Sequence, residues 1–234
     1  MLDTLCKGMD QVARNKGKLD PIGELFKGAW GIYRKRFWAL FSIIIVPVVL
    51  FRIIDFVFTQ PSVLPLFFVS LVNALGSVAM VFSIYKNAGF IESYRYALRS
   101  FWPLLLIVVL IFVMLVLGVI AFIVPALILY VWFMFYVYIF VVEDRRDVTV
   151  IAQSREYVRG YWWPIFGRIL PWLILIVVAY ELSIHLFGKQ LYLIPLSVFN
   201  VFISPLIVSY SYKLYENMTI LKPDLNAVSL SIFR

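Results

Sequence analysis

Two pairs of ionisable side chains lie within stretches of this sequence that are otherwise apolar. Arg52 and Asp55 are three residues apart. Glu181 and His185 are four apart, so each pair would share one face of a helix. An ionisable group inside a membrane is costly unless it is paired or hydrated, which makes it a candidate for function. The pairs predict either interfacial ion pairs, with Lys189 close by, or one outward-facing polar vestibule that binds a headgroup or a polar solute.

A catalytic or metal-binding role is the weakest of the alternatives for these side chains. A zinc site commonly has three or four protein ligands, and only Asp55, Glu181 and His185 are candidates here. The sequence contains no HExxH, GxSxG, P-loop or GxGxxG motif. We therefore expect no enzyme activity, no metal and no cofactor, and an intramembrane enzyme is only a third class of function.

Four arginines close to the predicted cytoplasmic face are candidates for contacts with lipid phosphate: Arg34, Arg99, Arg159 and Arg168. Arg168 lies one to two turns inside the fifth predicted span, from which a long side chain can reach the interface. A role in transport is the alternative for Arg168.

Two asparagines occupy the middle parts of the second and sixth predicted spans. Asn73 and Asn200 are 127 residues apart, which is two periods of the internal repeat described below. Equivalent positions on two spans predict hydrogen bonds between helices. The alternative is a polar pathway lined by both residues.

The elements that must position these residues are membrane spans. The 43 residues from Ser100 to Val142 include no Asp, Glu, Lys, Arg or His. As a helix they would extend about 65 Å, roughly twice the ~30 Å hydrocarbon core of a bilayer, so the chain must cross and return. Proline disfavours helix at the preceding residue, which predicts the break at Val124-Pro125. The same reasoning predicts six spans in all: 37–58, 64–85, 101–124, 125–142, 161–186 and 191–212.

The composition excludes a soluble domain. Hydrophobic residues make up 63% of the chain and charged residues 15%, against about 25% charged residues in soluble proteins. The first apolar segment begins only at Phe37, behind a basic amphipathic stretch, so we expect no cleavable signal peptide. A single cysteine, Cys6, allows no intramolecular disulfide.

Lysine and arginine concentrate on one side of the predicted spans. Residues 1–36, the loops after the second and fourth spans and the C-terminal tail carry 18 of the 21. The opposite connections contain only Lys189. The positive-inside rule therefore predicts that both termini are cytoplasmic, as expected for a multi-pass protein of a bacterial cytoplasmic membrane. The net charge of +8 would then face anionic lipid headgroups, and we expect no nucleic-acid partner.

The spans also form an internal repeat. Trp38, Trp102 and Trp163 each lie near the start of an odd-numbered span, at intervals of 64 and 61 residues. A basic amphipathic segment precedes each of these spans, and the three begin at Ile22, Phe90 and Val148. The pattern predicts three helical hairpins, each preceded by an amphipathic helix in the cytoplasmic interface.

Several motifs carry a family resemblance over residues 22 to about 170. They are the segments 23–26 (GELF), 33–37 (YRKRF), 94–102 (YRYALRSFW), 122–125 (FIVP), 141–144 (VVED) and 152–163 (AQSREYVRGYWW). This pattern resembles the six-span YciC-like inner-membrane proteins of bacteria and the membrane domain fused to some glycerophosphodiester phosphodiesterases. The family's usual Pro-Gly at the central turn is Pro125-Ala126 here. The resemblance implies an architecture, and without a phosphodiesterase domain it implies no hydrolysis.

The sequence thus predicts an all-α, polytopic membrane protein with a cytoplasmic N-terminal segment (1–21), a six-helix domain (22–213) and a cytoplasmic tail (214–234). We expect a non-enzymatic protein that binds lipid or organises the membrane. The alternative is a small transporter or channel-like component with a polar path between spans 1, 2, 5 and 6. Membrane lipids are the expected partners, and the residues leave a protein partner or a homo-oligomer open.

Overall fold

The computed structural model describes residues 19–57, 63–191 and 193–225. Within these ranges the chain forms helices and no strand. The helices are α2 (Ile22–Val57), α3 (Val63–Lys86), α4 (Phe90–Arg99), α5 (Phe101–Ala121), α6 (Ile123–Trp132), α7 (Tyr136–Val142), α8 (Thr149–Val158), α9 (Trp162–Leu191) and α10 (Leu193–Leu221). Six described segments are long and apolar enough to cross a membrane, which confirms the predicted class.

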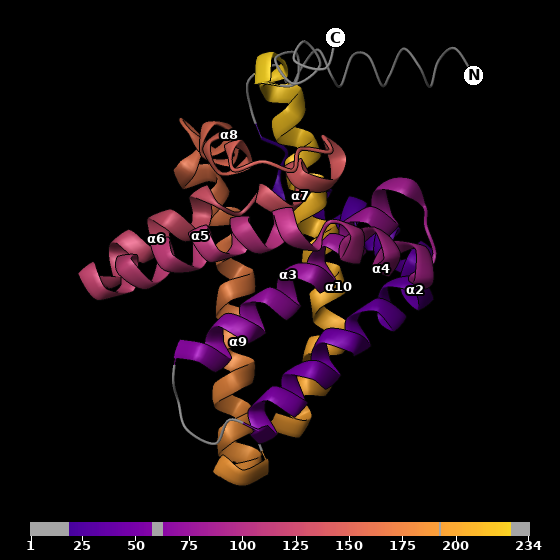
Figure 1. The fold of residues 1–234 in the computed structure, drawn as a ribbon, viewed down its shortest axis with the longest axis vertical. Coiled ribbons are helices and arrows are strands. Elements are labelled where there is room, and N and C mark those ends of the chain that lie inside the picture. The colour runs from indigo at the N-terminus through magenta and orange to yellow at the C-terminus, as the bar shows by residue number, and fades with distance from the viewer. Residues whose placement is uncertain (1–18, 58–62, 192, 226–234) are drawn as a thin grey trace.

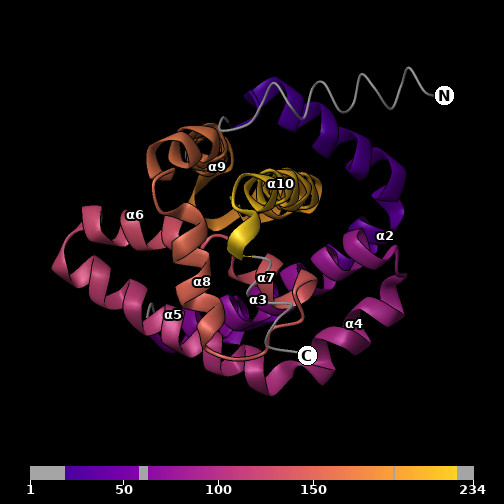
Figure 2. The ribbon, with the colours of Figure 1, turned by 90° about the horizontal axis from the view of Figure 1, so that it is seen from above.

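The apolar helices do not form a parallel bundle. Figures 1 and 2 show α9 and α10 side by side along the long axis of the molecule, whereas the α5–α6 hairpin lies crosswise to them. Helix α10 is central, because it packs against α2, α3 and α9. The hairpin therefore diverges from α9 and α10.

The most buried residues lie where α3, α7 and α10 meet. They include residues 78–81 and 137–141, together with Tyr210, Leu214 and Tyr215 of α10. Elsewhere large apolar side chains stay exposed, most clearly along α5 and α9. In a membrane protein such surfaces face lipid.

Helix α2 combines the predicted amphipathic helix and the first span in one bent helix. The bend is at Arg36, which has non-helical φ and ψ of −118° and 19°. The Arg36 guanidinium donates hydrogen bonds to the carbonyls of Ser83 and Ala88, the latter at 3.0 Å. The bend is thus fixed by carbonyls at the C-terminal end of α3 and in the loop that follows it.

The break between α5 and α6 lies earlier than predicted. The extended residue is Phe122 (φ 179°, ψ 160°), rather than Val124 or Pro125. Pro125 lies in the first turn of α6, where its missing N–H has no helical partner to lose. The turn is tight because Gly118 faces Ala126 closely: a Cβ on Gly118 would lie 3.1 Å from the Ala126 Cα.

The predicted span 125–142 is confirmed as a membrane-capable segment, Val124–Val142. Its helix is interrupted between α6 and α7, which the sequence did not predict. Ser154 of α8 inserts its side chain at the interruption. The Ser154 hydroxyl donates to the Trp132 carbonyl at 2.6 Å and accepts from the Phe135 N–H at 3.2 Å. A side chain that enters the helical hydrogen-bond ladder in this way produces a kink without proline or glycine.

The last two helices differ from their predicted limits. Gly188, with a positive φ of 70°, bends the chain two residues after the predicted end of the fifth span. The boundary predicted at residue 213 falls inside α10, which continues to Leu221. Leu214, Tyr215 and Met218 are buried, so this part of the predicted tail belongs to the core.

Candidate functional site

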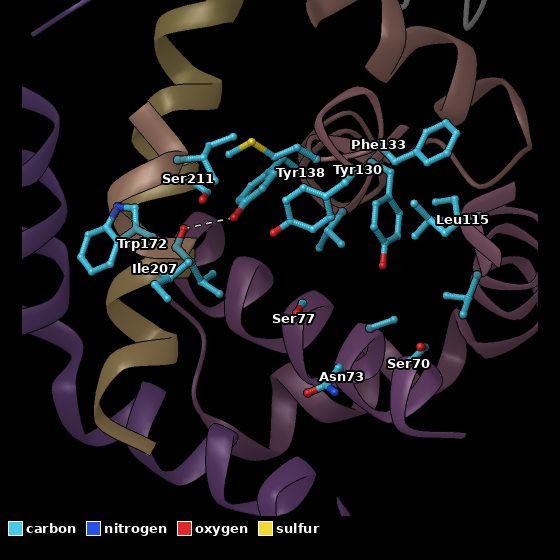
Figure 3. Close-up of a pocket in the computed structure, with 18 of the residues that line it drawn as sticks. Ser70, Asn73, Ser77, Leu115, Tyr130, Phe133, Tyr138, Trp172, Ile207 and Ser211 are labelled. Atoms are coloured by element: carbon cyan, nitrogen blue, oxygen red, sulfur yellow. Dashed lines mark hydrogen bonds between the residues drawn. The ribbon is translucent and has the colours of Figure 1, made fainter. Parts of the chain in front are cut away.

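A cavity of about 390 Å³ lies where the α5–α6 hairpin diverges from α3, α9 and α10. We call it the hairpin cavity; Figure 3 shows most of its lining. Residues of α3, α5, α6, α7, α9 and α10 contribute to its walls, together with the interruption between α6 and α7. Its volume falls within the ~300–1,000 Å³ of small-molecule sites.

The polar residues of the hairpin cavity come from several helices and include Ser211 of α10. Ser70, Asn73 and Ser77 follow one another at intervals of three and four residues on α3, so they form one stripe. Tyr130 of α6 and Tyr136 of α7 contribute hydroxyl groups. Figure 3 shows Tyr130 and the three α3 side chains around the same space.

Some of these polar groups are already hydrogen-bonded and others are not. The Ser70 hydroxyl donates to the Leu66 carbonyl at 2.8 Å. Tyr138, which also lines the cavity, donates to the Val208 carbonyl at 3.2 Å (Figure 3). Four other polar side chains of the lining make no hydrogen bond within the described residues; they are Asn73, Ser77, Tyr130 and Tyr136. The cavity therefore offers unused donors and acceptors in an apolar setting.

A second cavity, of about 190 Å³, lies between α2, α3 and α10. We call it the α2 cavity. Asn73 lines both cavities, and Asn200 lines the α2 cavity together with Ser197 and Ser204. The two predicted asparagines thus share one cavity, but no hydrogen bond joins them in the described part of the chain.

The residues of the predicted vestibule lie on α2 and α9, which Figure 2 shows on different sides of α10. Arg52 is half-buried on α2, whereas Glu181 and His185 are exposed on α9. The side chains of Asp55 and Lys189 lie outside the described part of the structure. No ion pair joins the described members, so the vestibule stays a prediction.

Arg168 has different partners from those predicted. Its guanidinium donates to the carbonyls of Leu19 at 3.0 Å, Asp20 at 2.8 Å and Pro164 at 2.9 Å. Asn217 of α10 completes this contact, because its Nδ2 donates to the Asp20 carboxylate at 2.6 Å. Arg168 therefore holds the segment before α2, and these bonds occupy the donors proposed for lipid phosphate.

Replacing Arg168 with alanine is expected to release Leu19 and Asp20 from α9 and to lower the free energy of unfolding by about 1–3 kcal/mol, because carbonyls lose their donors. Thermal unfolding in detergent measures the loss. Arg99→Ala is the matched control, because Arg99 is exposed. Equal unfolding temperatures for the two variants would show that the contact contributes nothing.

The other proposed phosphate ligands are accessible. Arg34 and Arg99 are exposed, and Arg159 is exposed while it pairs with Glu156 at 3.5 Å.

A buried carboxylate at the end of α7 was not identified from the sequence. Glu143 accepts hydrogen bonds from the hydroxyls of Tyr157 at 3.0 Å and Tyr215 at 2.8 Å, and from Gln153 at 2.5 Å. Arg145 lies 3.8 Å away, and its side chain is only 11% exposed. Burial and the Glu143 carboxylate raise the pKa of Tyr157, so this tyrosine keeps its proton and donates at neutral pH.

We call this group the Glu143 cluster; it consists of Glu143, Arg145, Gln153, Tyr157 and Tyr215. The cluster joins α7, α8 and α10. In the sequence, the cluster is visible only as Glu143, which directly follows an apolar run, and as Gln153 and Tyr157 in the motif at 152–163. That signal does not reveal that the groups meet, because Tyr215 is 72 residues from Glu143. The described residues contain no group of three or more His, Cys, Asp and Glu side chains that could hold a metal ion.

No protein-family model, curated protein or solved structure matches the chain. The resemblance to the YciC-like membrane proteins therefore stays a prediction.

Proposed function

We propose that the protein is a non-enzymatic integral membrane protein that binds a lipid molecule in the hairpin cavity. The observation that carries this proposal is the position of the cavity, which lies between apolar helices and has mainly apolar walls with a few polar groups. Sites of this composition hold small amphiphilic ligands. The exposed apolar faces of α5 and α9 border the same region, so a lipid could enter from the bilayer.

The membrane setting that we propose is a bacterial cytoplasmic membrane with both termini on the cytoplasmic side. The distribution of lysine and arginine supports this orientation. Trp38, Trp102 and Trp163 are 78%, 73% and 75% exposed, as tryptophans anchored at a membrane interface would be. The three hairpins with interfacial helices remain part of this proposal, as does membership of the YciC-like family.

Filling the cavity tests lipid binding. Ser77→Phe adds an aromatic ring to the cavity wall, so we expect at least about tenfold less co-purifying lipid, a change of about 1.4 kcal/mol. Native mass spectrometry of the protein in mild detergent measures the bound lipid. Leu66→Phe adds a ring to the same helix at an exposed position outside the lining, and it should retain the lipid.

The outcome that contradicts lipid binding is equal lipid retention by wild type, Ser77→Phe and Leu66→Phe, or no specific lipid on any of them. Size-exclusion chromatography of each variant shows whether the fold is kept.

A small transporter or channel-like component is the second candidate. The observation in its favour is that Asn73 lines both cavities, which places polar side chains from α3 and α10 along one route. The two linings include residues of spans 1, 2, 5 and 6, and the hairpin cavity is lined by spans 3 and 4 as well. Passage of a solute would require hydration along the route, whereas lipid binding requires only the hairpin cavity.

A further inference from the structure

We infer that the ligand of the hairpin cavity is an uncharged lipid with a free hydroxyl group, such as a neutral glycerolipid or a long-chain isoprenoid alcohol. This inference rests on the proposed function, because it names the chemistry of the lipid that the same cavity binds. The two sources share one free hydroxyl on an uncharged and largely apolar molecule.

The described lining of the hairpin cavity has no charge that could neutralise an ionic headgroup. None of the described residues that line the hairpin cavity or the α2 cavity is Asp, Glu, Lys, Arg or His. A phosphate or carboxylate that entered would leave water without meeting an opposite charge, which costs several kcal/mol. An anionic headgroup is therefore disfavoured.

The cation next to the hairpin-cavity lining on α9 does not change this conclusion. Arg168 precedes the lining residue Ile169 on α9, but its guanidinium donates to carbonyls on and before that helix. A phosphate in the cavity would have to compete with Leu19, Asp20 and Pro164 for these donors.

Four polar side chains of the lining can form hydrogen bonds with a ligand. The Asn73 amide supplies two donors and one acceptor, and the Ser77, Tyr130 and Tyr136 hydroxyls can each donate and accept. A hydroxyl group also does both, so it can satisfy neighbours of either kind. Asn73 and Tyr130 are also exposed at the surface. A purely apolar chain would leave without a partner each of the four groups that it covered, which argues against an alkane-like ligand.

Matched pairs of lipids test this inference on the purified full-length protein in detergent. One pair is diacylglycerol and phosphatidic acid with the same acyl chains; the other is a polyprenol and its phosphate. We expect the alcohol of at least one pair to bind at least about tenfold more tightly than its phosphate, measured by competition with a fluorescent lipid. The pair with the tighter alcohol identifies the source.

Conservative variants link the affinity to the cavity. Asn73→Leu and Tyr136→Phe should each weaken binding of the alcohol severalfold and leave binding of the phosphate unchanged. Tyr85→Phe is the matched control, because Tyr85 lies on α3 outside both linings. Thermal unfolding verifies that each variant folds.

The outcomes separate the two proposals. Equal or tighter binding of the phosphates overturns the inference but keeps lipid binding in the cavity. Equal affinities for wild type, Asn73→Leu and Tyr136→Phe also overturn the inference. If none of the four lipids binds although a lipid co-purifies with the wild type, the inference alone is overturned. If no lipid co-purifies either, the proposed function fails together with it.

Discussion

Glu143→Ala is expected to lower the free energy of unfolding by about 3–5 kcal/mol, because it removes one partner of a buried ion pair. The Glu143 side chain is 6% exposed, and Arg145 is its charged neighbour. Without the carboxylate, the guanidinium would stay buried without a compensating charge. The hydroxyls of Tyr157 and Tyr215 would also lose their acceptor. Thermal or denaturant unfolding in detergent, followed by circular dichroism, measures the loss.

The adjacent acidic residue supplies the control. Asp144 pairs with Arg146 at 3.0 Å, and its side chain is 67% exposed. Asp144 has a positive φ of 50°, which asparagine tolerates better than alanine. Asp144→Asn removes the charge without that strain and should therefore cost less than about 1 kcal/mol, as is usual for exposed pairs. If both variants lose the same stability, the Glu143 cluster does not join α7, α8 and α10 as described.

The sequence predicts the apolar spans well, because each depends on local composition. The ends and interruptions depend on contacts between distant residues, so local patterns predict them poorly. Pro125 suggests a break at its own position, yet a proline also fits the first turn of a helix, and the chain breaks at Phe122. The interruption between α6 and α7 depends on Ser154, about 20 residues further along.

Of the two asparagines singled out from the sequence, only Asn73 lines the hairpin cavity. The sequence reasoning singled out Asn73 and Asn200, and both line the α2 cavity. It missed the hydroxyls of Tyr130 and Tyr136, because within an apolar span a tyrosine is hard to distinguish from a core aromatic residue. The roles of Arg168 and Glu143 depend on partners up to 149 and 72 residues away, which spacing along one helix cannot show.

Gly76 should be the glycine with the clearest packing role in the bundle. A Cβ at Gly76 would lie 2.8 Å from the Pro47 Cγ of α2, and the proline ring is rigid. Gly76→Ala is therefore expected to push α2 away from α3 and to lower the free energy of unfolding by about 1–3 kcal/mol. Because Pro47 lines the α2 cavity, the same change should alter that cavity.

A second glycine separates this packing effect from intrinsic helix propensity. At Gly31 of α2, an added Cβ meets nothing within 4 Å, so Gly31→Ala should stabilise the protein by about 0.4–1 kcal/mol. The two substitutions are chemically identical and both lie within helices, yet opposite signs are expected. Unfolding temperatures in the same detergent give both values. A shift of the same sign and size for both would mean that α2 and α3 do not approach at Gly76, and the wall of the α2 cavity formed by Pro47 would then be absent.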